Sequence, residues 1–88
     1  MSIEDFTNEI SSFFIFSYNL PLSIISARHS LYIAESAILL NKLLEDKISI
    51  NSWLNTYNKN LRSKPAEFFY TEKKSKSALY YLRSHTEM

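Results

Sequence analysis

The chain has 88 residues and contains no glycine. Average usage of about 7% would give roughly six glycines in a chain of this length. Glycine-rich phosphate loops, Rossmann-type turns and Asn-Gly hairpins need backbone conformations that glycine adopts most readily. The composition therefore excludes nucleotide-binding folds that depend on such loops, together with hairpins closed by Asn-Gly turns.

The chain also has no cysteine. This excludes disulfides, thiol nucleophiles, thiolate zinc sites and iron–sulfur ligation. A domain this short then needs a dense apolar core for its stability. Six Phe, six Tyr and one Trp supply large side chains for that core. We expect one compact domain over residues 1–88.

Apolar periodicity predicts two helices in the first half of the chain. Ser2 and Asp5 form a pair resembling a capping box, and a helical stripe of apolar residues at positions 3, 6, 10 and 13, continued by Ser17, predicts a helix over residues 3–18. Pro21 is compatible with a first helical turn, and a second stripe predicts a longer helix over residues 21–45.

The second half of the chain predicts shorter helices. Residues 45–51 are interpreted as a connector, because four alternating residues are too few for a confident strand. The spacing of the apolar residues 53, 57 and 61 predicts a helix over residues 50–60. Pro65 suits the first turn of a further helix, and Thr71 suits the cap of a final one. The predicted fold is all-α: a compact bundle of four to five helices with no sheet.

The most apolar stretch, residues 10–25, does not predict a membrane span. Serine, asparagine and proline interrupt it, and no run approaches the roughly 18 to 20 apolar residues that a span needs. The acidic residues Glu4 and Asp5 stand where a signal peptide would be basic. We expect a cytoplasmic protein with no membrane association.

No residue pattern predicts catalysis. The two histidines, His29 and His85, fall in different predicted helices and form no metal-binding spacing. A nucleophile elbow of the Gly-x-Ser-x-Gly kind needs glycine, and acidic residues that are adjacent in sequence diverge on a helix. We expect no enzymatic activity, no metal and no cofactor. His29 lies on an apolar stripe and is interpreted as a core residue whose ring nitrogen finds a partner.

Charge is distributed unevenly along the chain. Residues 1–58 carry a net charge of −3 and residues 59–88 a net charge of +4. A basic segment with interleaved tyrosines is typical of nucleic-acid binding. Nucleic-acid-binding domains usually have a pI higher than about 9, whereas the pI of this chain is about 8.0. The candidate nucleic-acid-binding residues are Lys59, Arg62, Lys64, Lys73, Lys74 and Lys76.

The run Phe13-Phe14-Ile15-Phe16 places large apolar side chains on every side of one helix. One interpretation is a central helix that is buried all round. The other is that Phe14 or Phe16 lies in an interface with a partner or with a second copy of the chain, where aromatic residues are enriched. Both remain open from the sequence.

The segment from residue 53 to residue 69 carries a more specific pattern. Its matching positions are Trp53, Leu54, Thr56, Asn58, Leu61, Lys64, Pro65 and Glu67. They resemble the toxin-binding domain of the Xre/MbcA/ParS antitoxin family, which shows Trp-Leu, Thr-Pro-Asn, Leu, a Gly-rich turn, Lys or Arg, Pro and a Leu/Glu-containing helix start. Arg62 and Ser63 stand where the family has its glycine pair. The resemblance covers residues 33–85.

The resemblance implies a protein that neutralises a partner toxin, typically an NAD-degrading toxin of the RES type, by plugging the entrance of its active site. It also implies a toxin-contacting surface at Tyr80, Tyr81 and Arg83. The small size and the many aromatic residues favour a protein-binding inhibitor in their own right. The alternatives are a phage or bacteriocin-immunity type inhibitor of another enzyme, and a nucleic-acid-binding regulator that uses the basic C-terminal half.

Overall fold

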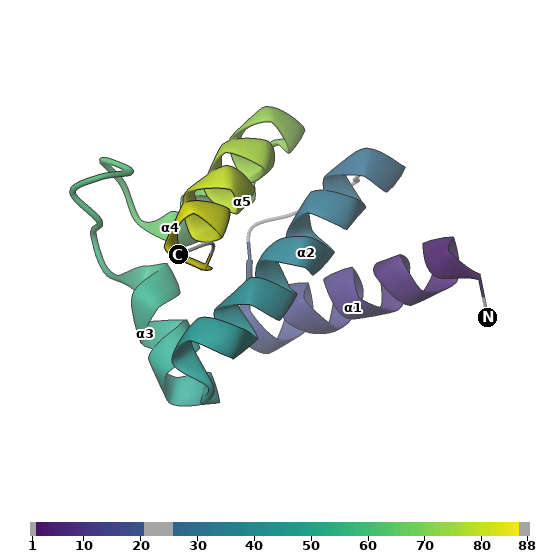
Figure 1. The fold of residues 1–88 in the computed structure, drawn as a ribbon, viewed down its shortest axis with the longest axis horizontal. Coiled ribbons are helices and arrows are strands. Elements are labelled where there is room, and N and C mark those ends of the chain that lie inside the picture. Colours follow the sequence, from purple (N-terminus) through teal and green to yellow (C-terminus); the bar gives the residue numbers. More distant parts are fainter. Residues whose placement is uncertain (1, 21–25, 87–88) are drawn as a thin grey trace.

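The computed structural model describes residues 2–20 and 26–86. These residues contain five helices and the segments that connect them (Figure 1). In chain order they are α1 (Ile3–Tyr18), α2 (Ala27–Leu44), α3 (Lys47–Asn55), α4 (Pro65–Phe68) and α5 (Glu72–Thr86). These residues contain no strand or sheet. The all-α prediction is confirmed, and the described residues pack as one compact globule.

The first helix has the predicted bounds. Ser2 caps α1, because its Oγ accepts a hydrogen bond from the backbone N–H of Asp5 at 3.1 Å. Asn19 ends the helix in a left-handed conformation, and its N–H donates to the carbonyl of Ile15. Two local capping contacts therefore set both ends of α1.

The second helix is shorter than predicted. Ser26 has an extended backbone (φ −75°, ψ 166°) and caps α2 by accepting a hydrogen bond from the N–H of His29. The prediction of one helix over residues 21–45 is therefore wrong at its N-terminal end, and its positions 21–25 lie outside the described residues. Glu45 ends the helix with a positive φ of 63°.

The third helix begins earlier than predicted. Asp46 caps α3: one carboxylate oxygen accepts from the N–H of Ser49 and the other from its hydroxyl, both at 2.8 Å. The predicted connector over residues 45–51 and the predicted helix over residues 50–60 are therefore wrong in position. The helix ends at Asn55, and Asn58 then forms a turn by accepting hydrogen bonds from two following N–H groups.

The last two helices begin at the predicted residues. Pro65 occupies the first turn of α4, where a missing N–H costs nothing. Thr71 caps α5, because its Oγ1 accepts from the N–H of Lys74 at 3.2 Å. Both starts confirm what the two residue types indicated.

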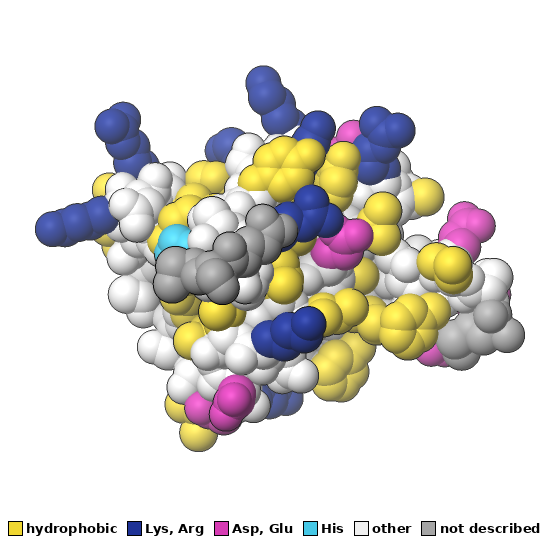
Figure 2. Space-filling model, viewed as in Figure 1, with side chains coloured by type: hydrophobic (Ala, Val, Ile, Leu, Met, Phe, Trp, Pro, Cys, Tyr) yellow, Lys and Arg dark blue, Asp and Glu magenta, His cyan; other side chains and the backbone are white. Residues whose placement is uncertain are grey.

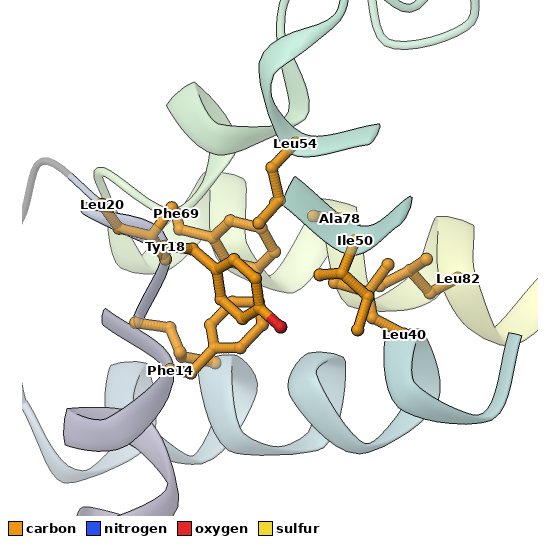
Figure 3. Close-up of a cluster of buried hydrophobic side chains, with 10 residues drawn as sticks. Phe14, Tyr18, Leu20, Leu40, Ile50, Leu54, Phe69, Ala78 and Leu82 are labelled. Atoms are coloured by element: carbon orange, nitrogen blue, oxygen red, sulfur yellow. The ribbon is translucent and has the colours of Figure 1, made fainter. Parts of the chain in front are cut away.

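The second helix lies at the centre of the fold, with α1 and α5 packed against it (Figure 1). In the core, the rings of Phe14, Tyr18 and Phe69 gather at one end, with centroids 4.9 and 6.0 Å from Phe14, and aliphatic residues fill the other (Figure 3). The aliphatic residues of that end are Leu40, Ile50, Ala78 and Leu82, whereas Leu20 and Leu54 lie toward the rings. His29 is buried with Nε2 3.0 Å from the carbonyl of Phe69, which confirms its interpretation as a core residue.

Candidate binding surfaces

The first helix buries a side that carries both hydroxyl groups and aromatic rings. Its buried residues are Thr7, Ser11, Phe14 and Tyr18. The apolar stripe identified in the sequence faces outward instead, with exposed fractions of 84% for Ile3, 51% for Phe6 and 70% for Phe13. An apolar helix face left uncovered is a candidate for contact with another molecule.

Hydrogen bonds between α1 and α2 explain this orientation. The hydroxyl of Ser30 lies 2.8 Å from that of Ser11 and 3.1 Å from Oδ1 of Asn8. The hydroxyl of Ser11 also lies within hydrogen-bond distance of two carbonyl groups, those of Thr7 and Ser30. Buried hydroxyl groups cost free energy unless they are paired, so this network removes the cost of burying Ser11 and Ser30. Phe14 and Tyr18 on the same side of α1 pack in the core and stabilise this orientation by apolar burial, which leaves the apolar stripe outside.

A groove of about 240 Å³ runs beside the exposed stripe. Ile10 and Phe13 of α1 form part of one wall, and Ile38 of α2, itself partly exposed, lies in the other. Tyr18 also lines the groove. Burial of its hydroxyl raises the pKa of that group, and the negative charge of the Asp46 carboxylate adds a smaller effect in the same direction, so the hydroxyl stays neutral. We call Ile3, Phe6, Ile10 and Phe13 of α1, together with the neighbouring Ile38 of α2, the α1 stripe.

The two predicted interface phenylalanines have different fates. Phe14 is only 3% exposed, because its ring packs between Tyr18 and Phe69. Its prediction as a partner-binding residue is therefore wrong for the folded chain. Phe16 is 84% exposed, but it follows Ile10 by six residues and is turned about 120° from it around the helix axis. Phe16 is thus outside the α1 stripe.

A second candidate surface lies on α5. Lys73, Lys76, Tyr80 and Arg83 have a spacing that places them on one side of the helix; we call them the α5 stripe. The Tyr80 ring, 53% exposed, lies between two cations: Nζ of Lys76 is 5.6 Å and Cζ of Arg83 is 5.7 Å from its centroid. Arg83 also donates to a carboxylate oxygen of Glu35 on α2 at 2.7 Å. This contact holds its guanidinium near the ring.

Tyr81, predicted together with Tyr80, belongs to a different surface. Its hydroxyl accepts a hydrogen bond from Asn60 at 3.1 Å, and its ring lies 4.5 Å from that of His85. With Trp53 it lines a separate groove of about 180 Å³. The structure therefore brings Tyr80 and Arg83 together and separates Tyr81 from them.

The predicted nucleic-acid-binding cations are exposed but divided between two areas. Lys73 and Lys76 belong to the α5 stripe, whereas Lys74 precedes Tyr81 by seven residues and shares its side of the helix. Three further cations, at positions 59, 62 and 64, belong to the segment between α3 and α4. Figure 2 shows Lys and Arg side chains spread over the left, the top and the middle of this face, without one continuous patch.

No three His, Asp or Glu side chains of the described residues lie close enough together to hold a metal ion. Within residues 2–20 and 26–86, no helix has the length and apolar character needed to cross a membrane.

Comparisons with protein family models, with curated proteins and with solved structures found no match to this chain.

Proposed function

We propose that this chain is a small protein-binding inhibitor that neutralises its partner by steric occlusion. In this proposal the α5 stripe enters an acidic cleft on the partner. The observation that carries it is the position of Tyr80, an exposed ring held between the side chains of Lys76 and Arg83. The protein would act in the cytoplasm without catalysing a reaction.

The geometry of the α5 stripe suits such a role for a physical reason. Tyrosine and arginine dominate binding energy at many interfaces, because they offer a large contact area with a polar tip. The pair formed by Arg83 and Glu35 is exposed and adds little to the stability of the fold. It does hold the guanidinium in place, so that less side-chain entropy is lost on binding.

The resemblance to the Xre/MbcA/ParS antitoxin family gives the proposal its most specific form, an antitoxin of an NAD-degrading RES-type toxin. One backbone angle supports this form. Arg62 has a φ of 58°, the left-handed region that glycine favours, and it stands where the family has its glycine pair. An inhibitor of another enzyme, of the phage or bacteriocin-immunity type, would use the same α5 stripe.

A nucleic-acid-binding regulator is the second candidate. It is favoured by the exposure of the cations at positions 59, 62, 64, 73, 74 and 76. Their division between two areas makes one continuous phosphate track along α5 a poorer fit than an acidic cleft. Binding to phosphates would also lose affinity steeply with added salt, because each contact releases counterions.

The test is an affinity capture from the native host after nuclease treatment, with matched variants. We expect a single protein partner to bind the native chain and Tyr70→Ala, which removes a tyrosine of comparable exposure outside the α5 stripe. Tyr80→Ala should weaken binding at least tenfold, as expected for a residue at the centre of an interface. If the partner is an enzyme, its activity should fall in proportion to the complex formed.

Two results would overturn the proposal. One is equal partner affinity for Tyr80→Ala and Tyr70→Ala. The other is capture of nucleic acid alone, lost after nuclease treatment and abolished when Lys73, Lys74 and Lys76 are all changed to Glu, which would establish the regulator instead.

A further inference from the structure

We propose that a second copy of this chain covers the α1 stripe, so that two copies form an antiparallel, two-fold symmetric dimer through α1. Figure 2 shows hydrophobic side chains exposed at the right of the molecule, where α1 lies in Figure 1. This inference is independent of the α5 stripe and of the proposed inhibition.

The exposed apolar area matches what a stable dimer needs. With about 200 Å² per residue, a value within the range for aromatic side chains, the exposed fractions of Ile3, Phe6, Phe13 and Ile38 correspond to roughly 500 Å² per copy. A standard interface takes about 800 Å² from each partner, and a little over half of that area is non-polar. The α1 stripe therefore supplies the apolar part of one complete interface.

The order of the residues along α1 favours a partner of the same sequence. Phe6 lies four residues before Ile10, and Phe13 lies three residues after it. When two α1 helices pair antiparallel about Ile10, Phe6 of each copy therefore lies opposite Phe13 of the other. A two-fold axis requires this kind of self-complementary contact.

The groove beside the stripe can receive an aromatic ring. Its volume of about 240 Å³ exceeds the roughly 150 Å³ of an apolar cavity that binds benzene. In the antiparallel pairing, Phe6 of the second copy lies beside Phe13, which lines this groove. Each copy thus offers one ring and one groove, and the two contacts are equivalent by symmetry.

The charges of α1 select the antiparallel direction. Glu4 and Asp5 lie in its first turn, and α1 contains no Lys or Arg. Parallel pairing would place these carboxylates side by side. Antiparallel pairing about Ile10 separates the two Glu4 residues by about 18 Å along the helix, which is beyond the screening length of roughly 8 Å at physiological salt. In this arrangement Glu9, which precedes Ile10, is the acidic residue of α1 that lies nearest to the same residue of the second copy.

Sedimentation equilibrium over a range of concentrations tests the dimer. We expect the native chain to dimerise reversibly, and Phe13→Glu to weaken the dimer at least a hundredfold. Phe16→Glu is the matched control, because Phe16 is an exposed phenylalanine on the same helix outside the stripe; its dissociation constant should change less than threefold. Circular dichroism must show native helix content for both variants. A native chain that stays monomeric, or equal effects of the two variants, would overturn the proposal.

Because the chain contains no cysteine, single cysteines can be introduced for a second test, which measures cross-linking of a folded dimer. In the antiparallel dimer, Ile10→Cys places two thiols next to the two-fold axis, within reach of a disulfide. Ile3→Cys places them about 21 Å apart along the helix. We expect mild oxidation to cross-link Ile10→Cys at least tenfold faster than Ile3→Cys. Faster cross-linking of Ile3→Cys would contradict the antiparallel arrangement.

Discussion

Among residues 2–20 and 26–86, three individual residues have a positive φ, which glycine adopts most readily. Asn19, Glu45 and Arg62 have φ values of 55°, 63° and 58°. Asparagine tolerates this region because its short side chain bonds locally, whereas other residues bring Cβ close to the following carbonyl oxygen, at a cost of about 1–2 kcal/mol. A chain without glycine accepts this cost at Glu45 and Arg62 to end α2 and to close the turn before α4.

Glycine at these two positions should therefore stabilise the fold. We expect Glu45→Gly and Arg62→Gly each to raise the free energy of unfolding by about 0.5–1 kcal/mol, because the relief of strain exceeds the extra entropy that glycine loses on folding. This corresponds to an increase in Tm of several degrees for a domain of this size. Chemical denaturation measures the effect. Asn19→Gly is the control, and an equal or larger gain at that position would contradict the explanation.

At the scale of the helices, capping residues were the part of the sequence that best located the elements. Ser2 and Thr71 marked the starts of α1 and α5 correctly, because each hydroxyl accepts a hydrogen bond from an N–H three residues later. The predicted connector over residues 45–51 is wrong at the start of α3, because Asp46 caps that helix. Its bonds to Ser49 are the same kind of signal, and the sequence contained it.

The burial of α1 could not be predicted in the same way. Periodicity correctly identifies a stripe of Ile3, Phe6, Ile10 and Phe13, but it does not show whether that stripe faces the core. The decision depends on contacts that form only in the folded chain, such as the packing of Phe14 against Phe69 and the hydrogen bond between Ser30 and Ser11, which are 19 residues apart in sequence. For the same reason the sequence did not distinguish Phe14, which is buried, from its neighbours in the aromatic run.

The cap of α3 should make this helix sensitive to acid. Hydrogen bonds from the backbone N–H of Ser49, and then from its hydroxyl, hold the pKa of the Asp46 carboxyl below its ordinary value. A group with a lowered pKa in the folded state contributes stability above its unfolded pKa and loses that contribution as the pH falls through the folded value. The contribution is therefore complete at neutral pH and declines below about pH 3.9.

Asp46→Asn isolates this effect, because asparagine also caps helices but does not titrate there. From neutral pH to about pH 5, we expect a constant difference in free energy of unfolding between the native chain and Asp46→Asn. Below about pH 3.9, the native chain should lose stability relative to Asp46→Asn. Urea denaturation across this range measures it. A difference that stays constant through the acid range would show that the Asp46 contacts do not form in solution.

At the scale of the whole molecule, the two candidate surfaces differ in chemistry and belong to different helices. The α1 stripe is apolar and is bordered by carboxylates on a helix that has no cation. The α5 stripe is cationic around one tyrosine. Both helices pack against α2, and the two surfaces adjoin where Ile38 and Arg83 line one pocket. Phe13→Glu and Tyr80→Ala change residues outside this pocket, so the two proposed contacts can be tested separately.

Added salt should weaken the contact of the α5 stripe and should not weaken the α1 dimer. Binding of the α5 stripe to an acidic cleft depends on attraction between opposite charges, which salt screens, so the affinity for that partner should fall as salt rises. The α1 dimer depends on apolar burial and brings two Glu9 residues near each other, so screening should leave its affinity unchanged or raise it severalfold. Sedimentation equilibrium measures the affinity of the dimer and calorimetry measures the affinity for the partner, with one protein preparation over one salt series.

Glu9→Gln should tighten the dimer and remove its response to salt. A dimer that weakens with salt in parallel with partner binding would show that attraction between opposite charges, and not the apolar α1 stripe, holds the two copies together.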